Sequence, residues 1–390
     1  MKESLFNYRF EYENQKYIFN TNNNGLIQIN NDIFTEEERE YLRVNRFWVD
    51  DNEDEIALLE REINHNIQKR QKELELTIAL TNYCNFSCVY CYQNKNEKLM
   101  TTEVANMIIE KIDRILNDNI FEGINIHYFG GEPLLNIPVL IYLDENIKKI
   151  TDKIGIVYKA FLTTNGSELL QKVKFSSIQL TFDGLEKTHD RLRVSDHFHF
   201  KEEIELIENI MNFSQAKVLL RTNICKENKD EIIALHKYIF EKFGNERIEI
   251  NPNRTIKYHQ DDSFEMLSVQ EYAEVAYQIK LLWSEQKGKF ELPVPRSTPC
   301  KFPYGNAYAI SPEGYCTFCS GSMDQEKKYF FDVDIENKKM FSVRKECKKC
   351  NILPLCLGGC IIQYNLRAGA CTYEKYELKN ILISYIKHIS

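Results

Sequence analysis

Between residue 74 and about residue 265, short apolar runs alternate with longer stretches in which apolar positions recur with a helical period. The apolar runs have the length of strands and are Leu74–Leu80, Ile124–Tyr128, Ile156–Leu162, Ile178–Phe182, Val218–Thr222 and Ile248–Ile250. The amphipathic stretches between them include Thr101–Leu116, Lys201–Met211 and Lys229–Phe243. Strands that alternate with helices in this way predict βα units and a parallel sheet.

Polar and glycine-rich motifs come directly after the predicted strands. In chain order they are Cys84–Cys91, Gly130-Gly131-Glu132-Pro133, Thr163-Thr164-Asn165-Gly166 and Asp183-Gly184, while Arg221, Asn223 and Cys225 close the fifth strand. In barrels of parallel strands, ligands bind beyond the carboxyl ends of the strands. The motifs therefore predict one site at this edge of the sheet.

The pattern of residues 1–73 predicts a separate small α+β module. A short meander with Asn-rich turns is expected from Phe6–Tyr12, Tyr17–Asn20 and Leu26–Ile29. Helices are expected at Glu36–Leu42 and Asp54–Arg70. The module is followed by the βα region at 74–270 and a third region at 271–390.

Composition and charge exclude several classes of function. The chain has 390 residues and a formal net charge of −8, so no general electrostatic attraction to nucleic acid or to an anionic membrane is expected. The N-terminus lacks the basic segment and apolar stretch of a signal peptide, and no apolar run reaches about 18 residues. We expect a cytoplasmic protein.

Eleven of the twelve cysteines fall into two groups, at residues 84–91 and 300–371. In a reducing compartment, clustered thiols indicate metal binding. Cys84, Cys88 and Cys91 can hold three corners of a [4Fe–4S] cube and leave one iron open to a small molecule. The alternatives are a zinc knuckle or buried structural cysteines, although zinc sites generally use four ligands with paired C-x-x-C spacing.

The C-x-x-x-C-x-x-C spacing after an apolar strand resembles the radical S-adenosylmethionine (SAM) superfamily. That resemblance implies an α/β fold, a partial (β/α)6 TIM-like barrel, whose three-cysteine cluster binds SAM and cleaves it reductively to a 5′-deoxyadenosyl radical. The radical removes hydrogen from unactivated carbon, while the protein supplies positioning and excludes solvent.

The resemblance also implies roles for residues at the strand ends. Gly130, Gly131, Glu132 and Pro133 match the motif that holds the amino group and methionine part of SAM, although Glu132 could instead only brace the loop. Tyr90 occupies the position that lies against the adenine, with loop packing as the alternative. Residues similar to those that bind the ribose and carboxylate are Asn165, Gln179, Asp183 and Arg221.

The carboxyl-terminal cysteines match the SPASM domain, which carries two auxiliary iron–sulfur clusters. The matching elements are Cys300, Gly314, Cys319, Cys347-x-x-Cys350, Cys356, Cys360 and Cys371. Carried over by position, the first auxiliary cluster takes Cys300, Cys319 and Cys360, and the second takes Cys347, Cys350, Cys356 and Cys371. The resemblance thus implies three [4Fe–4S] clusters in all.

Relatives with a fully ligated first auxiliary cluster have a further cysteine upstream of the first, and none lies between Cys225 and Cys300. Either an iron of that cluster is open or Cys316 completes it. Residues 306–319 read as a β-hairpin with a turn at Ser311–Gly314, and along a strand Cys316 and Cys319 point to opposite sides. We therefore expect Cys316 to be a buried apolar residue, and Cys225 to fill the core.

Enzymes with this arrangement mostly modify peptides. The expected activity is maturation of a ribosomal precursor peptide by a crosslink, with a thioether favoured because an open auxiliary iron could bind a substrate thiolate. Carbon–carbon crosslinking and an anaerobic sulfatase-type maturase that forms formylglycine are the alternatives. A non-catalytic iron–sulfur or zinc protein remains a third. Expected partners are the precursor peptide and a reducing protein such as ferredoxin or flavodoxin. The N-terminal module would bind the leader of the peptide or, alternatively, form a lid on the open side of the barrel.

Overall fold

The computed structural model describes residues 1–29, 34–118, 121–168, 171–244, 247–258, 263–304, 306–317, 319–321, 328–333, 340–360, 363 and 371–389. The chain folds into two compact units. The first unit comprises Met1–Gln68, Ser268–Cys300 and Lys339–Ser390, and the second comprises Lys69–Leu267 and Lys301–Lys338.

The second unit is built on the parallel sheet that the apolar runs predict. Its strands are paired in chain order and are β6 (Glu73–Ala79), β7 (Gly123–Phe129), β8 (Val157–Thr163), β9 (Phe175–Thr181), β10 (Lys217–Ile224) and β11 (Ile248–Arg254). Each predicted strand overlaps its observed one. The predicted partial barrel is therefore confirmed.

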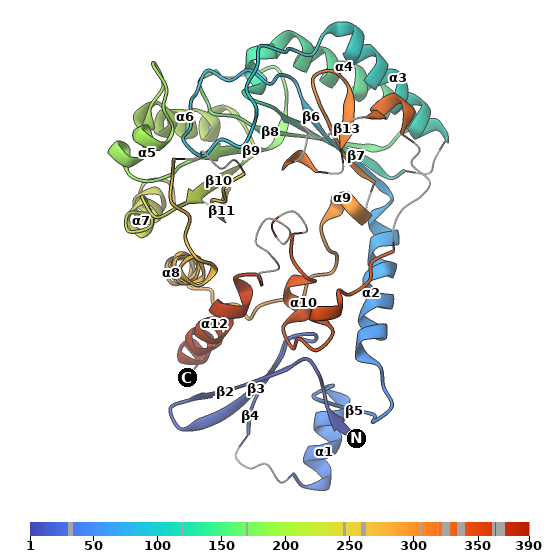
Figure 1. The fold of residues 1–390 in the computed structure, drawn as a ribbon, viewed down its shortest axis with the longest axis vertical. Coiled ribbons are helices and arrows are strands. Elements are labelled where there is room, and N and C mark those ends of the chain that lie inside the picture. The colour runs from blue at the N-terminus through green and yellow to red at the C-terminus, as the bar shows by residue number, and fades with distance from the viewer. Residues whose placement is uncertain are drawn as a thin grey trace. The chain divides into compact units, whose positions relative to one another are not determined.

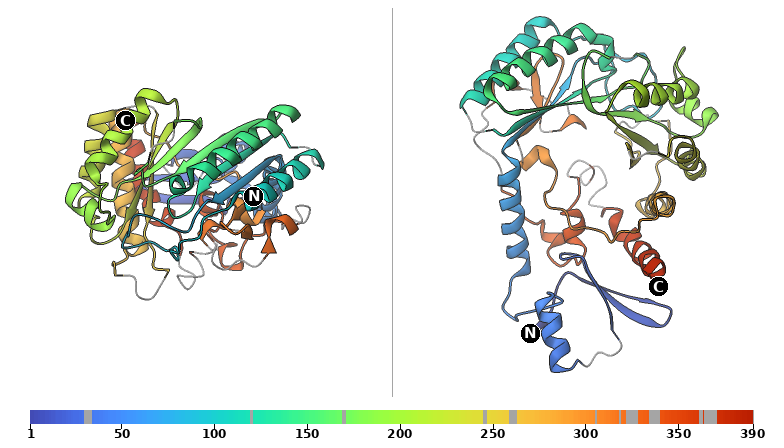
Figure 2. Two further views of the ribbon diagram at one scale, coloured as in Figure 1. Left: turned by 90° about the horizontal axis from the view of Figure 1, so that it is seen from above. Right: turned by 180° about the vertical axis from the view of Figure 1, so that it is seen from behind.

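Helices cover the outer face of this curved sheet (Figures 1 and 2). They are α3 (Thr102–Asp118), α4 (Ile137–Ile154), α5 (Glu186–Leu192), α6 (Phe200–Phe213) and α7 (Ile232–Phe243). In α3 the buried residues Ala105, Ile108, Ile112 and Ile115 recur at three- and four-residue spacing, which makes one apolar stripe. Burial also alternates along β7, where Ile124 and Ile126 are fully buried and His127 is half-buried.

The predicted hairpin after residue 306 continues the barrel sheet. Strand β12 (Ala307–Ile310) pairs in parallel with β6, and β13 (Tyr315–Thr317) and β14 (Lys328–Tyr329) follow it in antiparallel pairing. The turn needs a left-handed residue, which Gly314 supplies at φ 85°. Short helical segments of this unit are α9 (Lys301–Tyr304), η1 (Pro133–Asn136) and η3 (Phe330–Asp332).

The first unit begins with the predicted N-terminal meander, an antiparallel sheet of β2 (Asn7–Tyr12), β3 (Gln15–Asn20) and β4 (Gly25–Ile29). The short strands β1 (Lys2–Glu3) and β5 (Trp48–Val49) pair beside it. Helices α1 (Glu36–Val44) and α2 (Glu55–Arg70) follow as predicted. A capping box between Thr35 and Glu38 satisfies the first backbone N–H groups of α1.

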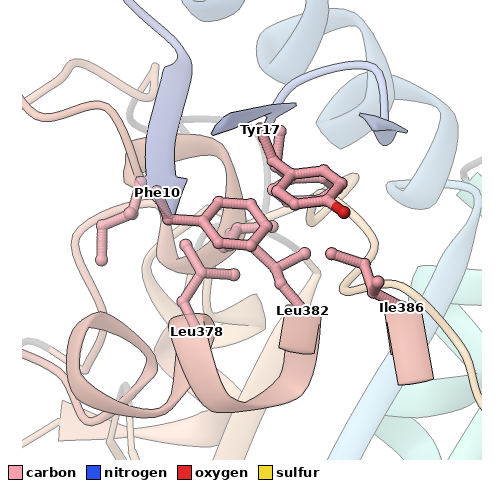
Figure 3. Packing of buried hydrophobic residues seen from close by; sticks show 8 residues of the cluster. Phe10, Tyr17, Leu378, Leu382 and Ile386 are labelled. Atoms are coloured by element: carbon pink, nitrogen blue, oxygen red, sulfur yellow. The ribbon is translucent and has the colours of Figure 1, made fainter. Parts of the chain in front are cut away.

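Carboxyl-terminal helices complete the core of the same unit. They are α8 (Val269–Lys287), α10 (Leu353–Cys356) and α12 (Glu374–Ile389), with a 3-10 turn η4 (Lys345–Cys347). Phe10 and Tyr17 stack at 5.3 Å and pack against Leu378, Leu382 and Ile386 of α12 (Figure 3). The N-terminal sheet therefore shares one hydrophobic core with the last helix. Among the described helices, none combines the length and apolarity needed to cross a bilayer.

Candidate active site at the carboxyl ends of the barrel strands

Cys84, Cys88 and Cys91 lie on the loop between β6 and α3, and each is partly buried. A tight turn brings the last two together, because the Cys91 N–H donates to the Cys88 carbonyl at 3.1 Å. Burial raises the pKa of the Cys88 thiol to about 12, and the Arg193 guanidinium opposes that rise. Thiolate ligation here therefore needs a cationic partner, which an iron–sulfur core supplies.

The loop after β7 lies directly against the backbone that leads into the cysteine loop. A Cβ on Gly130 would come within 2.4 Å of the Thr81 carbonyl oxygen, and one on Gly131 within 2.1 Å of the Tyr83 carbonyl oxygen. The N–H groups of Gly131 and Glu132 donate to those same two carbonyls at 2.8 and 2.9 Å. The two glycines are thus required for close packing of the two loops.

Glu132 is fully buried, and its carboxylate is occupied by protein donors. It accepts hydrogen bonds from the Leu134 N–H at 3.0 Å, the Thr164 hydroxyl at 2.7 Å and the Asn165 N–H at 2.6 Å. Burial raises the pKa of Glu132 to about 7, against the lowering effect of these hydrogen bonds. This arrangement ties the loop after β7 to the loop after β8, which matches the bracing alternative. The neighbouring Pro133 is buried at the start of η1.

Asp183 holds the cysteine loop to the ends of β9 and β10. Its buried carboxylate accepts a hydrogen bond from the hydroxyl of Tyr90, the residue that precedes Cys91 in the chain. It accepts a second from the Asn223 N–H at 2.7 Å. Its backbone carbonyl accepts from the Asn228 side chain at 2.8 Å. Burial raises the pKa of both Asp183 and Tyr90. Tyr90 also packs with Leu192, Cys225 and Phe264.

Of the remaining predicted SAM contacts, one lies at the cysteine loop and two lie within barrel strands. The Asn165 side chain lies at the cysteine loop, with its amide nitrogen 3.8 Å from the Cys84 sulfur and 2.8 Å from the Asn85 oxygen. Gln179 lies within β9, where it donates to the Thr163 hydroxyl at 3.3 Å. Arg221 lies within β10 and donates to the Asn223 side chain at 2.8 Å.

Four of the carboxyl-terminal cysteines surround one cavity of about 420 Å³ in the first unit. Its lining includes Cys347, Cys350, Cys356 and Cys371, the set expected for the second auxiliary cluster. Burial raises the pKa of Cys356 to about 11. Four thiols around a cavity are the donor set that a [4Fe–4S] cluster takes. Within the described residues, no three His, Cys, Asp or Glu side chains are grouped closely enough to hold a single metal ion.

The other cysteines are placed as follows. Cys300 and Cys360 are exposed residues of the first unit, and Cys319 is a partly buried residue of the second. Cys316 is buried in β13, with 6% of its surface exposed, and Cys225 is fully buried. The expectation that Cys316 and Cys225 are buried is confirmed.

Sequence reasoning missed a buried charged group beside the cysteine loop. Arg193 donates to Glu203 at 3.1 Å, and His189 lies 3.6 Å from the same carboxylate. The helical period of α6 indicates that Glu203 is buried, because this residue lies on the apolar stripe between Phe200 and Ile207.

Comparisons with known proteins agree with this geometry. Residues 78–239 match the model of the Radical SAM superfamily. A GTP 3',8-cyclase of Clostridium perfringens is 32% identical over 177 residues, which span 41% of this chain and 50% of that protein. The chain thus covers about half the length of that relative. The radical SAM cyclopropyl synthase TigE of Paramaledivibacter caminithermalis is 24% identical over 371 residues, 83% of this chain and 76% of that protein.

Solved structures share the fold. Native anSMEcpe with bound AdoMet superposes with a TM-score of 0.61 at 18% identity, over 81% of this chain and 98% of that one. Streptococcus suis SuiB bound to its precursor peptide SuiA gives 0.54 at 16% identity, over 93% and 96%. Both matches extend well beyond the barrel strands. Together with the family match, the cysteine loop and the strand-end motifs identify residues 78–239 of this chain as a radical SAM domain.

Proposed function

We propose that this chain is a radical SAM maturase that crosslinks a ribosomally made precursor peptide, with a thioether as the favoured bond. The observation that carries the proposal is the three-cysteine loop at the carboxyl edge of a partial barrel, with the loops after the second, third and fourth strands packed around it. When bound, a reduced [4Fe–4S] cluster and SAM supply a radical able to remove hydrogen from an unactivated carbon.

Residues of the barrel would hold these groups in the following way. Cys84, Cys88 and Cys91 would ligate the cluster. The backbone at Gly130–Pro133 and the side chain of Asn165 would border SAM, since they lie against the cysteine loop. Tyr90, Gln179, Asp183 and Arg221 are proposed as further SAM contacts. Tyr90 and Asp183 would also hold the cysteine loop in place, because the Tyr90 hydroxyl donates a hydrogen bond to the Asp183 carboxylate.

Two auxiliary clusters are part of the proposal. The cavity lined by Cys347, Cys350, Cys356 and Cys371 supports the second of them. For the first, Cys300, Cys319 and Cys360 remain the proposed ligands. With Cys316 buried in its strand, one iron would stay open to a substrate thiolate, which favours a thioether. A ferredoxin or flavodoxin in a reducing cytoplasm would supply the electrons.

We further propose that the N-terminal module binds the leader of the precursor peptide. Among the described residues, β4 pairs with β3 alone, so its other edge offers backbone groups to an added strand. A cavity of about 300 Å³ lies beside it, lined by β4 and α1. Tyr41 and Val44 of α1 are more than half exposed at this cavity, which suits an apolar side chain of the peptide.

A second candidate is formation of a carbon–carbon bond. Its support is the alignment with the cyclopropyl synthase TigE over 76% of that protein. The formylglycine-forming activity of a sulfatase-type maturase is a third candidate, supported by the shared fold with anSMEcpe.

Mass spectrometry of a precursor peptide incubated anaerobically with reconstituted protein, SAM and reductant tests this proposal. A thioether product has lost two hydrogen atoms and has a cysteine that no longer reacts with iodoacetamide. A product that has lost hydrogen but keeps a reactive cysteine would favour the carbon–carbon bond. If 5′-deoxyadenosine forms but every peptide remains unmodified, a peptide substrate is ruled out.

A further inference from the structure

A segment of the cysteine loop is hydrogen-bonded to the chain at the end of α5. The Ser87 N–H donates to the Val194 carbonyl at 2.7 Å, and the Val89 N–H donates to the Leu192 carbonyl at 3.0 Å. The residue numbers of these two bonds run in opposite directions, as in an antiparallel pair. Cys88 and Arg193 each lie between the residues so joined, and their side chains are close enough to interact electrostatically.

The Arg193 side chain is buried behind this loop and fixed in place. Only 6% of its surface is exposed, and its guanidinium carbon lies 5.2 Å from the centre of the Phe86 ring. One amino group donates to Glu203 of α6 at 3.1 Å. Although burial opposes its charge, the Glu203 carboxylate raises the pKa of Arg193 well above its ordinary value. Arg193 is therefore a permanent buried cation.

The Arg193–Glu203 pair leaves a donor and an acceptor unused. Among the described residues, the Arg193 Nε–H and the Glu203 Oε2 are buried without a hydrogen-bond partner. His189 lies 3.6 Å from that oxygen, and burial lowers the pKa of His189 so that it stays neutral. A buried donor without a partner costs free energy, so the Arg193 Nε–H is an unsatisfied group beside the cysteine loop.

We propose that Arg193 is a positioning residue for the radical SAM cluster: the guanidinium held by Glu203 lies beside Cys88 and raises the reduction potential of the cluster. A fixed positive charge near a cluster stabilises the reduced state relative to the oxidised one. This inference rests on the proposed function, because it takes Cys88 as a cluster ligand.

The test is the midpoint potential of the one cluster whose EPR signal changes when SAM is added, which separates it from the auxiliary clusters. Glu203→Gln leaves the cation without its partner, so the potential should shift upward. Arg193→Met combined with Glu203→Gln removes the cation and avoids an unpaired buried carboxylate, so the potential should fall below that of the wild type. Arg193→Lys should lie between the wild type and the double variant.

The matched control is Arg191→Met, which removes an exposed arginine two residues away on α5 and should leave the potential unchanged. Iron content is measured for every variant. If the double variant loads no barrel cluster, the midpoint potential of the Glu203→Gln variant alone tests the inference. Wild-type potentials in fully loaded Glu203→Gln and double variants would overturn the inference. A wild-type protein with no SAM-responsive signal would instead overturn the proposed function on which it rests.

Discussion

Gly131 shows how a single residue sets the position of the cysteine loop. Its backbone lies so close to the Tyr83 carbonyl that no side chain fits between them. Tyr83 immediately precedes Cys84, so any displacement at Gly131 is passed to the first cluster ligand. Glu132 adds a buried link from this loop to Asn165. Residues of this motif thus act on the cluster through the geometry of its loop.

Gly131→Ala should therefore reduce the iron bound by the barrel and the production of 5′-deoxyadenosine, because its Cβ would lie 2.1 Å from a carbonyl oxygen. Gly155→Ala is the control. Gly155 ends α4 in a left-handed conformation with no atom within 4 Å of an added Cβ. That change should cost about 1–2 kcal/mol of stability and leave the iron content intact. Equal iron contents in the two variants would contradict this account of Gly131.

A change at Cys316 distinguishes a first auxiliary cluster with three cysteine ligands and an open iron from one in which Cys316 is the fourth ligand. Because it is buried in β13, Cys316→Ala should leave iron content and crosslinking nearly unaltered, with a packing loss of about 1 kcal/mol. Cys319→Ala, three residues along, should remove the cluster. If both variants lose the cluster to the same extent, Cys316 is its fourth ligand and a thiolate-binding iron is no longer available.

His236 on α7 predicts a dependence of stability on pH. Burial lowers its pKa to about 4, and its ring lies 3.3 Å from the Thr222 hydroxyl of β10. Since the folded pKa is below the ordinary value of 6.5, the stabilising contribution is present above about pH 6.5 and is lost as pH falls toward 4. Between about pH 7 and pH 5 the loss should be about 2 kcal/mol.

Denaturant unfolding of wild type and His236→Gln under anaerobic conditions measures this contribution. The variant should be less stable at neutral pH, since a packed contact is lost, but its stability should fall less steeply on acidification. Identical slopes for the two proteins would show that His236 titrates with an ordinary pKa in the folded protein, so that its burial does not couple folding to pH.

At the scale of elements, the strands of the barrel were predictable because each is short and apolar, and the first five are followed by polar motifs. All six fall within a few residues of the expected positions, and so do the N-terminal strands and helices. The pairing of β12 with β6 was not predictable. A strand of four apolar residues can join either edge of a sheet, and its sequence does not name the partner.

The candidate site shows the same division. The motifs that mark its position could be found from the sequence, since their types and spacing are characteristic. The contacts of Glu132 and Arg193 could not, because a charged residue is expected at the surface until its buried partner is known. Those partners, Asn165 and Glu203, come from other elements.

The packing of α12 on the N-terminal sheet predicts cooperative unfolding of the first unit. Leu382 is fully buried against Phe10 and Tyr17 in this core. Leu382→Ala should lower the free energy of unfolding by about 2–5 kcal/mol, and hydrogen exchange should rise in β2 and β3 as well as in α12. The exposed Ile389→Ala is the control and should change little. Exchange that rises in α12 alone would show that the sheet folds independently.

At the scale of the whole molecule, the proposed function requires three clusters with different tasks. Ten cysteines are assigned to them, and three [4Fe–4S] clusters would bring about twelve irons per chain. The barrel cluster and the first auxiliary cluster each have three cysteine ligands in this assignment. The open iron of the barrel cluster is assigned to SAM, and that of the first auxiliary cluster to a substrate thiolate. The auxiliary clusters are not needed for SAM cleavage in this account, whereas Cys84, Cys88 and Cys91 are.

Production of 5′-deoxyadenosine by the anaerobically reconstituted protein, with SAM and dithionite, tests this claim most directly. The wild type and Cys225→Ala, which alters a buried cysteine outside the cluster sets, should cleave SAM at similar rates. The variant with Cys84, Cys88 and Cys91 changed to Ala should form no 5′-deoxyadenosine while keeping about eight irons in its auxiliary clusters. Cleavage of SAM by that variant at the wild-type rate would contradict the assignment of the three-cysteine loop.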